Sequence, residues 1–315
     1  CNHINAVADA FSKRTVLPDW YTYPSLAYSL AYLTAVPYIV QHKIAGADIP
    51  AISQFISDSK QFKLSVRAVL LFVSCLSVFW IYAVVRLRHR GHWEALLAAC
   101  LLGLSWEVAY HSRWIAPDVL MMQFLALALL GLVQSCEWTL PRGKRRHWLL
   151  FAAAAIGLAC GTKYNAIAFV PSLLIAAWFL WDPREGWRPL ATLVLQICFL
   201  VGGVFLLTTP GAVFEYDRFY TDLARQVTHY GELGHGGSTV DLGWSHVWQI
   251  LVYFATQAFS PYHWLAPFFF AFCPYGFYCI FRENDRLAVV LTSVLAFYLL
   301  MMALQVVLIV RNDLP

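Results

Sequence analysis

The strongest constraint on the fold is a series of apolar runs, each close to the roughly 20 residues that a helix needs to cross a bilayer. They lie near residues 65–86, 93–111, 117–136, 147–162, 164–181, 189–209, 265–281 and 287–310. Overall composition agrees, because 60% of the 315 residues are hydrophobic, only 13% are charged and the mean hydropathy is +0.60. The sequence therefore predicts an integral membrane protein.

These runs predict an all-α, polytopic transmembrane helical bundle of about eight spans, with juxtamembrane helices on its outer face. The expected regions are an outer loop with juxtamembrane helices over 1–64, transmembrane helices over 65–209, an outer loop with an interfacial helix over 210–264, and transmembrane helices over 265–315. The apolar stretch 24–41 contains Pro37, which favours a surface or re-entrant helix over a span. The mixed aromatic and charged residues of 214–237 predict an amphipathic interfacial helix followed by a glycine-rich turn.

Basic residues indicate the orientation, because loops rich in Lys and Arg stay in the cytoplasm. The basic loops are RLRHRGH (86–92), PRGKRRH (141–147) and, more weakly, WDPREGWRP (181–189). Counting spans from these loops places on the non-cytoplasmic face HSRWIAPD (111–118), GTKYN (161–165) and the segment 210–245. The basic stretch 41–67 opposes this assignment, although long loops follow the rule less strictly.

Residue usage argues against several classes of function. The net charge of +4 is small and scattered, which does not suggest nucleic acid binding. The eight cysteines lie mostly inside the apolar runs and form no C-x-x-C pair, so they indicate neither a disulfide framework nor a zinc site. The sequence GHGGS (234–238) lacks the G-K-S/T ending of a phosphate-binding loop.

Four ordered landmarks carry a resemblance to a known family. They are NHINAVADAFSKRTVLPDWYTYPSL (2–26), YHSRWIAPDVLM (110–121), GLACGTKYNAIAF (157–169) and a closing RNDLP (311–315). Together they resemble the polyprenyl-phosphate-dependent glycosyltransferases of the C-type membrane fold, which are related to protein O-mannosyltransferases and aminoarabinose transferases. The resemblance covers most of the chain. It implies an Asp-Glu pair immediately before Cys1, so we expect the chain to be an interior fragment.

The resemblance implies an inverting transfer of a sugar from a polyprenyl (dolichyl)-phosphate donor to a protein, lipid or glycan acceptor. The reaction is expected at the non-cytoplasmic face of a plasma, inner or endoplasmic reticulum membrane. The departing phosphate needs fixed cations, and the candidates at predicted outer span ends are Arg113, Lys163 and Arg311. An acceptor hydroxyl needs a carboxylate base. The resemblance places that base upstream of Cys1 and gives Asp118 an auxiliary role.

Substrate-binding candidates complete the predicted site. His3 and Tyr23 occupy positions in the first landmark, and His111 lies in the second. His229 and Tyr230 resemble the polar outer loop that covers the sugar in this family. The sequence identifies no cofactor, because the spacing of its histidines supports no metal site. Use of a divalent cation stays an open alternative.

Each of these assignments has a simpler alternative. Arginine and lysine beside spans often only anchor the interface, with their charged ends reaching water. A polytopic transporter would also hold charges among its spans, but near the bilayer midplane and usually with an internal repeat. A non-catalytic lipid-binding membrane subunit shares the apolar composition. The donor sugar, the acceptor and the oligomeric state do not follow from the sequence.

Overall fold

The computed structural model describes residues 2–89, 91–234, 239–258, 260, 262, 264–283 and 285–306. Its α-helices are α1 (Asn2–Ser12), α2 (Leu26–Ile44), α3 (Ile49–Asp58), α4 (Lys60–His89), α5 (His92–Gly103), α6 (Trp106–His111), α7 (Asp118–Ser135), α8 (Arg142–Cys160), α9 (Val170–Leu180), α10 (Arg188–Thr208), α11 (Gly211–Phe214), α12 (Tyr216–Thr228), α13 (Trp244–Tyr253), α14 (Ala266–Glu283) and α15 (Asp285–Ala303). Shorter helical turns are η1 (Tyr164–Phe169), η2 (Pro183–Glu185), η3 (His229–Leu233) and η5 (Phe254–Ala258). The fold is all-α, as predicted.

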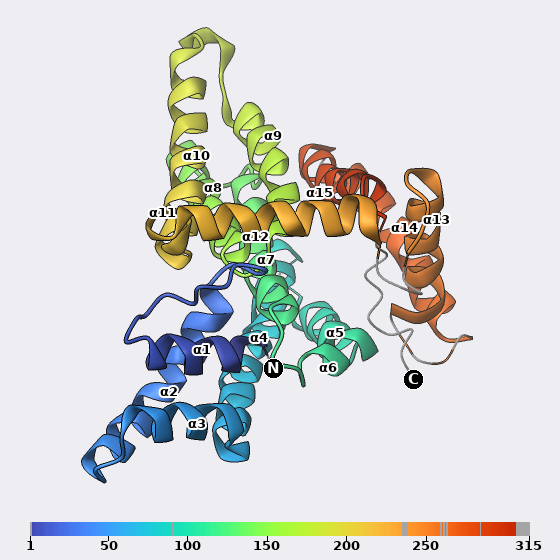
Figure 1. The fold of residues 1–315 in the computed structure, drawn as a ribbon. Coiled ribbons are helices and arrows are strands. Elements are labelled where there is room, and N and C mark those ends of the chain that lie inside the picture. The colour runs from blue at the N-terminus through green and yellow to red at the C-terminus, as the bar shows by residue number, and fades with distance from the viewer. Residues whose placement is uncertain are drawn as a thin grey trace.

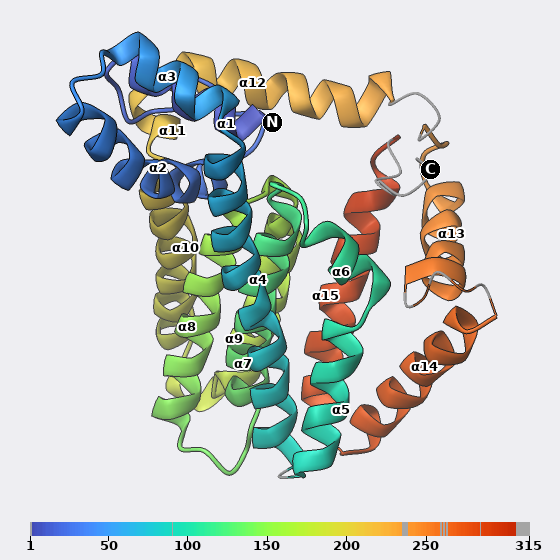
Figure 2. The same ribbon diagram turned by 90° about the horizontal axis from the view of Figure 1, so that it is seen from below.

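The helices form a bundle with a cap of helices across one end, and Figure 1 looks onto this end, where α12 lies across the front of α7 and α8. Figure 2 shows α4, α7, α8, α9 and α10 running between the two ends of the bundle, while α1, α3 and α12 lie across one of them. We call this capped end the α12 end. The segment 1–64, for which the sequence predicts juxtamembrane helices, and the segment after residue 210, for which it predicts an amphipathic helix, therefore form helices at this end. The end of α4, the start of α5 and the loops at 136–141 and 181–187 lie at the opposite end, which we call the basic end.

Helix α4 connects the cap to the bundle. It has 30 residues and contains no glycine or proline, so nothing in its sequence interrupts the helical hydrogen bonds. Its length of about 45 Å exceeds the roughly 30 Å of a hydrocarbon core. The first turns bury Phe62, Val66 and Leu70, four residues apart, against α1, α2 and α3. This part of α4 thus belongs to the cap and the remainder to the bundle.

Four of the described helices are long and apolar enough to cross a membrane, namely α4, α7, α10 and α15. They match predicted spans, although α15 ends at Ala303 and not at 310. The predicted span 93–111 is instead two helices, because Gly103 and Ser105 end the regular hydrogen bonding between α5 and α6. The predicted span 164–181 begins as the 3₁₀ turn η1, and α9 starts at Val170 next to Pro171.

Helices α7, α8, α9, α10 and α15 enclose the main apolar core. Small residues let their backbones approach closely. A Cβ on Gly131 of α7 would lie 2.7 Å from the carbonyl oxygen of Trp148, and one on Gly157 of α8 would lie 2.9 Å from the carbonyl oxygen of Val201. Alanine or larger at either position would force the helices apart. A second core lies under the cap, between α1, α2, α3 and the start of α4.

Ion pairs link neighbouring loops at the basic end. Arg88 at the end of α4 lies 2.9 Å from Glu137 and 3.7 Å from Glu283, and Arg142 of α8 pairs with Glu185. These contacts connect loops that are separate in sequence. The predicted basic loops 86–92, 141–147 and 181–189 therefore share one end of the molecule, as the alternation of the spans requires.

Candidate functional site

An ion pair at the α12 end joins the first residue of α7 to the loop after α8. The Nζ atom of Lys163 lies 2.6 Å from Oδ1 of Asp118. The side chains are mostly buried, with 9% of Lys163 and 21% of Asp118 exposed. Burial favours the neutral amine, but the carboxylate of Asp118 outweighs it, so the pKa of Lys163 is raised. Lys163 is therefore held as a buried ammonium group whose charge the carboxylate of Asp118 balances.

Local structure explains why these two side chains meet. Asp118 follows Pro117 at the start of α7, where the positive end of the helix dipole stabilises a carboxylate. Lys163 follows the end of α8, and its N–H donates to the carbonyl oxygen of Ala159 at 3.0 Å. Gly161, between Ala159 and Lys163 in the sequence, lies against the end of α10. A Cβ added to it would collide with the hydroxyl oxygen of Thr208. Close helix packing thus requires glycine here and fixes the loop that carries Lys163.

His3 lies in α1 near this ion pair. Its side chain is buried between aromatic rings, with centroid distances of 5.4 Å to Trp20 and 6.0 Å to Tyr23. Burial lowers the pKa of His3 to about 4, and the charge of Asp118 acts in the opposite direction. Its Nδ1 atom has no hydrogen-bond partner among the described residues. His3 is thus a neutral imidazole at physiological pH with a ring nitrogen available to a polar ligand.

Tyrosines complete the surroundings of the ion pair. The phenol groups of Tyr23 and Tyr230 lie close enough to Lys163 to affect its pKa. Tyr298 of α15 lies within electrostatic range of both Lys163 and Asp118. The ring of His229 is 5.3 Å from that of Tyr230 at the end of α12. Segments from the first 25 residues, the middle and the last third of the chain therefore meet at one place.

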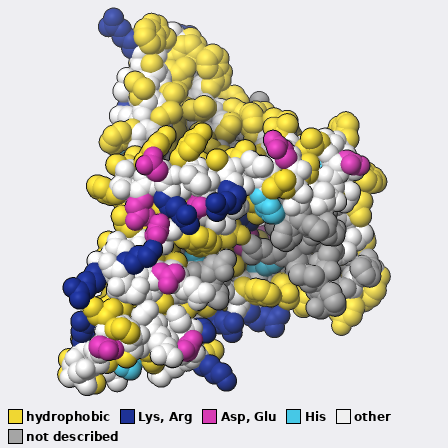
Figure 3. All heavy atoms as spheres, in the orientation of Figure 1, with side chains coloured by type: hydrophobic (Ala, Val, Ile, Leu, Met, Phe, Trp, Pro, Cys, Tyr) yellow, Lys and Arg dark blue, Asp and Glu magenta, His cyan; other side chains and the backbone are white. Residues whose placement is uncertain are grey.

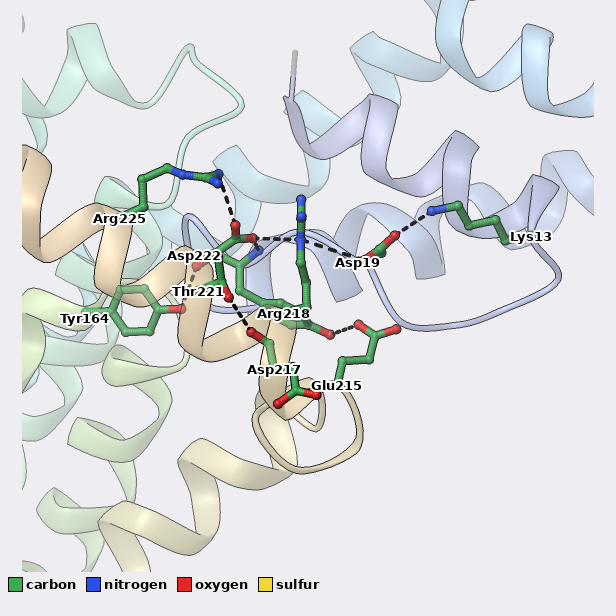
Figure 4. Close-up of polar contacts among 10 residues, drawn as sticks. Lys13, Asp19, Tyr164, Glu215, Asp217, Arg218, Thr221, Asp222 and Arg225 are labelled. Carbon is green, nitrogen blue, oxygen red and sulfur yellow. Dashed lines mark hydrogen bonds and ion pairs between the residues drawn. The ribbon is translucent and has the colours of Figure 1, made fainter.

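A charge network centred on Asp222 of α12 lies beside the site (Figure 4). Asp222 is buried, and its Oδ2 accepts a hydrogen bond from the backbone N–H of Tyr21 at 2.8 Å. Arg218 and Arg225, each 3.4 Å from a carboxylate oxygen of Asp222, flank it on the same helix. Figure 4 shows the network continuing through Asp19, which pairs with Lys13. Figure 3 shows acidic and basic side chains gathered over α12.

The network fastens the loop after α1 to α12. The phenol of Tyr21 donates to Glu215, and the backbone carbonyl of Tyr21 accepts a hydrogen bond from the phenol of Tyr164 at 2.8 Å. Burial, together with the neighbouring Glu215 carboxylate, raises the pKa of Tyr21. Tyr21 is thus held through its N–H, its carbonyl and its phenol. Because Trp20 and Tyr23 surround His3, this anchoring positions the aromatic side of the candidate site.

Residues 49–212 match the model of the dolichyl-phosphate-mannose-protein mannosyltransferase family. This chain belongs to that family. The match spans more than half of the chain and includes Asp118, Lys163 and the helices that bring them together. The resemblance to polyprenyl-phosphate-dependent glycosyltransferases is therefore confirmed, and the mannosyltransferase-family chain is a multi-pass membrane protein.

A solved structure shows the same fold. ArnT from Cupriavidus metallidurans, in the apo state, superposes on this mannosyltransferase-family chain with a TM-score of 0.51 and 15% sequence identity. The superposition covers 95% of this chain and 49% of that protein, so the chain spans about half of its length. No curated protein is significantly similar to the chain.

Two predicted site residues, His111 and Arg113, contact residues other than Lys163 and Asp118. The Nε2 atom of His111 lies 3.0 Å from Glu107, which also accepts a hydrogen bond from the phenol of Tyr253 at 2.5 Å. Arg113 is exposed and lies over the ring of Tyr110, 5.6 Å from its centroid. The hydrogen bond between Glu107 and Tyr253 connects α6 to α13, and none of these contacts runs to Lys163. Arg311 lies outside the described residues.

Sequence analysis missed several polar groups of the site. Arg218 and Asp222 are four residues apart, a spacing that places them on one helix face, and this pattern could have identified the network. Its connection to Tyr21 has no local signal, because the two positions are 201 residues apart. The described residues contain no group of three His, Cys, Asp or Glu side chains placed to hold a metal ion.

Proposed function

We propose that this chain forms part of an inverting glycosyltransferase that moves a sugar from a polyprenyl (dolichyl)-phosphate donor to a protein, lipid or glycan acceptor. The observation that carries the proposal is the buried Asp118–Lys163 ion pair at the α12 end, in a chain of this family. Such a reaction joins an acceptor oxygen to the anomeric carbon while the bond from that carbon to the phosphate oxygen breaks. The electron pair goes to the departing polyprenyl phosphate, and a base takes the acceptor proton.

Lys163 suits the role of donor-phosphate ligand. Its ammonium group has three N–H donors and donates one hydrogen bond to Asp118. The other N–H groups can donate to phosphate oxygens. In a buried position a cation stabilises developing negative charge more strongly than in water, and it is already in place when the bond breaks. Asp118 then acts as an auxiliary group that keeps Lys163 charged and oriented.

Arg113 and Arg311 remain proposed partners of the donor phosphate. Arg113 lies in the loop 112–117, directly before Asp118, and its exposed side chain can approach a phosphate at the membrane surface. The main base is proposed to be a carboxylate upstream of Cys1. These roles rest on the family pattern and on the chemistry of each side chain.

The sugar is proposed to lie beside the aromatic group formed by His3, Trp20 and Tyr23. A neutral imidazole with an available nitrogen can exchange hydrogen bonds with sugar hydroxyls, and aromatic faces pack on sugar rings. Tyr230 lies near the same ion pair from the turn η3, and the ring of His229 lies beside that of Tyr230. His111 is proposed to act nearby, through its hydrogen bond to Glu107.

The site is proposed to face the non-cytoplasmic side of the membrane. Support comes from the distribution of charge, because the three basic loops lie at the end opposite Lys163. A transporter is less consistent with this arrangement, since its coupling charges belong near the bilayer midplane. Asp118 and Lys163 instead occupy helix ends.

The test is transfer of radiolabelled sugar from a panel of polyprenyl-phosphate sugars by the full-length protein in membranes. We expect Lys163→Gln to reduce transfer by about 10²–10³-fold, the effect of removing one donor from a preorganised anion site. Arg113→Ala is expected to reduce transfer less, because its side chain is exposed. Arg184→Gln, at the basic end, is the matched charge-loss control.

Two results would contradict the proposal. The first is undiminished transfer by a folded Lys163→Gln protein. The second is an equal loss in Arg184→Gln, which would show that charge removal anywhere disturbs the protein. A loss in both Lys163→Gln and Arg113→Ala, with Arg184→Gln unchanged, supports a donor-phosphate site at the α12 end.

A further inference from the structure

A cavity of about 270 Å³ lies at the basic end, between the start of α8, the end of α9 and the start of α10. Its lining includes Arg142, Arg146, Trp181, Glu185, Leu190 and Leu193. We propose that this cavity binds the headgroup of an anionic glycerophospholipid. It lies at the opposite end of the bundle from Lys163, so this binding site is separate from the proposed transfer reaction.

The charges of the cavity match one phosphodiester. Arg142 pairs with Glu185, whereas Arg146 donates to the neutral side-chain oxygen of Gln196 at 2.8 Å. The ionisable lining residues thus carry two positive charges against one negative charge. A phospholipid phosphodiester carries the single negative charge that balances this excess. Arginine also offers paired N–H groups that fit two phosphate oxygens.

The cavity has the polarity expected at the membrane surface. Leu190 and Leu193 form an apolar wall beside the arginines, which suits the glycerol part of a lipid. Trp178 and Trp187 are exposed near the cavity, and tryptophan concentrates where lipid headgroups meet the hydrocarbon. Figure 3 shows hydrophobic side chains covering the arm formed by α9 and α10, with Lys or Arg side chains at its tip. Basic pockets between spans at this depth bind anionic headgroups.

The size of the cavity favours a headgroup over a whole lipid. Its volume is just below the roughly 300–1,000 Å³ of typical small-molecule sites. A glycerophosphate group fits within such a space, and acyl chains would lie outside it. Leu195 and Phe199 of α10 are exposed on the surface of the bundle, where acyl chains pack.

A second pair of arginines lies close to Arg142 and Arg146 at the basic end. Arg286 and Arg145 both lie over the ring of Trp138, at 3.9 Å and 4.8 Å from its centroid. These three residues line a smaller cavity that shares Leu180 with the larger one. The Nε atom of Arg145 is buried and has no hydrogen-bond partner among the described residues. This buried positive charge adds to the potential that attracts an anion to the basic end.

Gly143 provides a way to block the cavity without removing a charge. It lines the cavity, and a Cβ added to it meets no atom within 4 Å. A large side chain can therefore enter the open space without displacing the backbone. Lys144, the next residue, is exposed and does not line the cavity, so it provides a matched control for loss of charge.

The experiment measures lipid binding to the purified full-length protein by native mass spectrometry. The probes are short-chain phosphatidylglycerol, the matching phosphatidylcholine, and glycerol 3-phosphate as the free anion. We expect phosphatidylglycerol to bind at least about tenfold more tightly than the other two. Arg142→Gln with Arg146→Gln, and separately Gly143→Phe, should each weaken that binding about tenfold. Lys144→Gln should leave it unchanged.

The Glu185→Gln variant distinguishes a specific effect on lipid binding from a general loss of folding. Both Glu185→Gln and Arg142→Gln break the same ion pair, but only the former removes the negative charge that competes with the lipid. We expect Glu185→Gln to strengthen phosphatidylglycerol binding severalfold, which no general loss of structure can produce. Equal binding of the two phospholipids, or no effect of the Arg142, Arg146 and Gly143 variants, would overturn the proposal. Equally tight binding of glycerol 3-phosphate would overturn the assignment to a lipid.

Discussion

Asp222 on α12 accepts a hydrogen bond from the backbone N–H of Tyr21, which lies 201 positions earlier in the chain. The two residues connect the amphipathic helix to the loop that places Trp20 and Tyr23 around His3. The geometry of the candidate sugar pocket therefore depends on α12, although Tyr230, which lies near Lys163, belongs to the turn η3 that follows α12. Charge pairs on α12 are thus structural, and their loss should affect the site indirectly.

Asp222→Ala is expected to lower the free energy of unfolding by about 2–3 kcal/mol, because it leaves the buried N–H of Tyr21 without its charged acceptor. Asp222→Asn keeps an oxygen acceptor and should cost less. Thermal unfolding in detergent measures both. Equal losses for the two variants would show that the negative charge, and not the hydrogen bond, is what matters.

Asp118→Ala should destabilise the protein by about 3–5 kcal/mol, because it leaves a buried ammonium group without its partner. The double variant Asp118→Leu with Lys163→Met replaces the pair by apolar groups and should recover most of that stability. Transfer activity should stay low in the double variant. Recovery of both stability and transfer would rule out a functional role for the pair.

Gly161→Ala is expected to destabilise by about 1–3 kcal/mol, the usual cost of overpacking. The added Cβ collides with the hydroxyl of Thr208 and lies 2.9 Å from its Cβ. Adding Thr208→Ala removes the nearest atom and should restore part of the loss. Gly202→Ala on α10 is the control, since its Cβ meets nothing within 4 Å and alanine favours a helix. The measurement is the midpoint of thermal unfolding.

Stability should fall as the pH drops from about 6.5 towards 4. The pKa of His3 is about 4 in the folded protein, below its ordinary value of 6.5, so the unfolded chain binds a proton first. The contribution is fully present above pH 6.5 and is lost as the pH falls towards 4. His3→Phe should reduce this dependence. Parallel curves of unfolding temperature against pH for the two proteins would contradict a buried neutral His3.

Much of the candidate site could be predicted from residue type and span ends. Asp118 and Lys163 stand out because charged side chains beside apolar runs are costly and seldom accidental. Their 2.6 Å contact was not predictable, because it depends on the packing of α7 against α8. His111 and Arg113 lie in the same sequence motif as Asp118, yet their described contacts run to Glu107 and Tyr110. Proximity in sequence at a helix end does not decide where a long side chain points.

The sequence by itself determined the membrane class, the family resemblance, the membrane-length helices α4, α7, α10 and α15, and the amphipathic character of α12. The membrane class and the helices depend on composition and periodicity within single segments, and the family resemblance depends on the order of short motifs along the chain. Tertiary structure alone decided that His3, Asp118, Lys163 and Tyr230 gather at one end, and that Asp222 holds Tyr21. These contacts join residues more than forty positions apart, so only the closely packed helices, with glycine at 131, 157 and 161, determine which side chains meet.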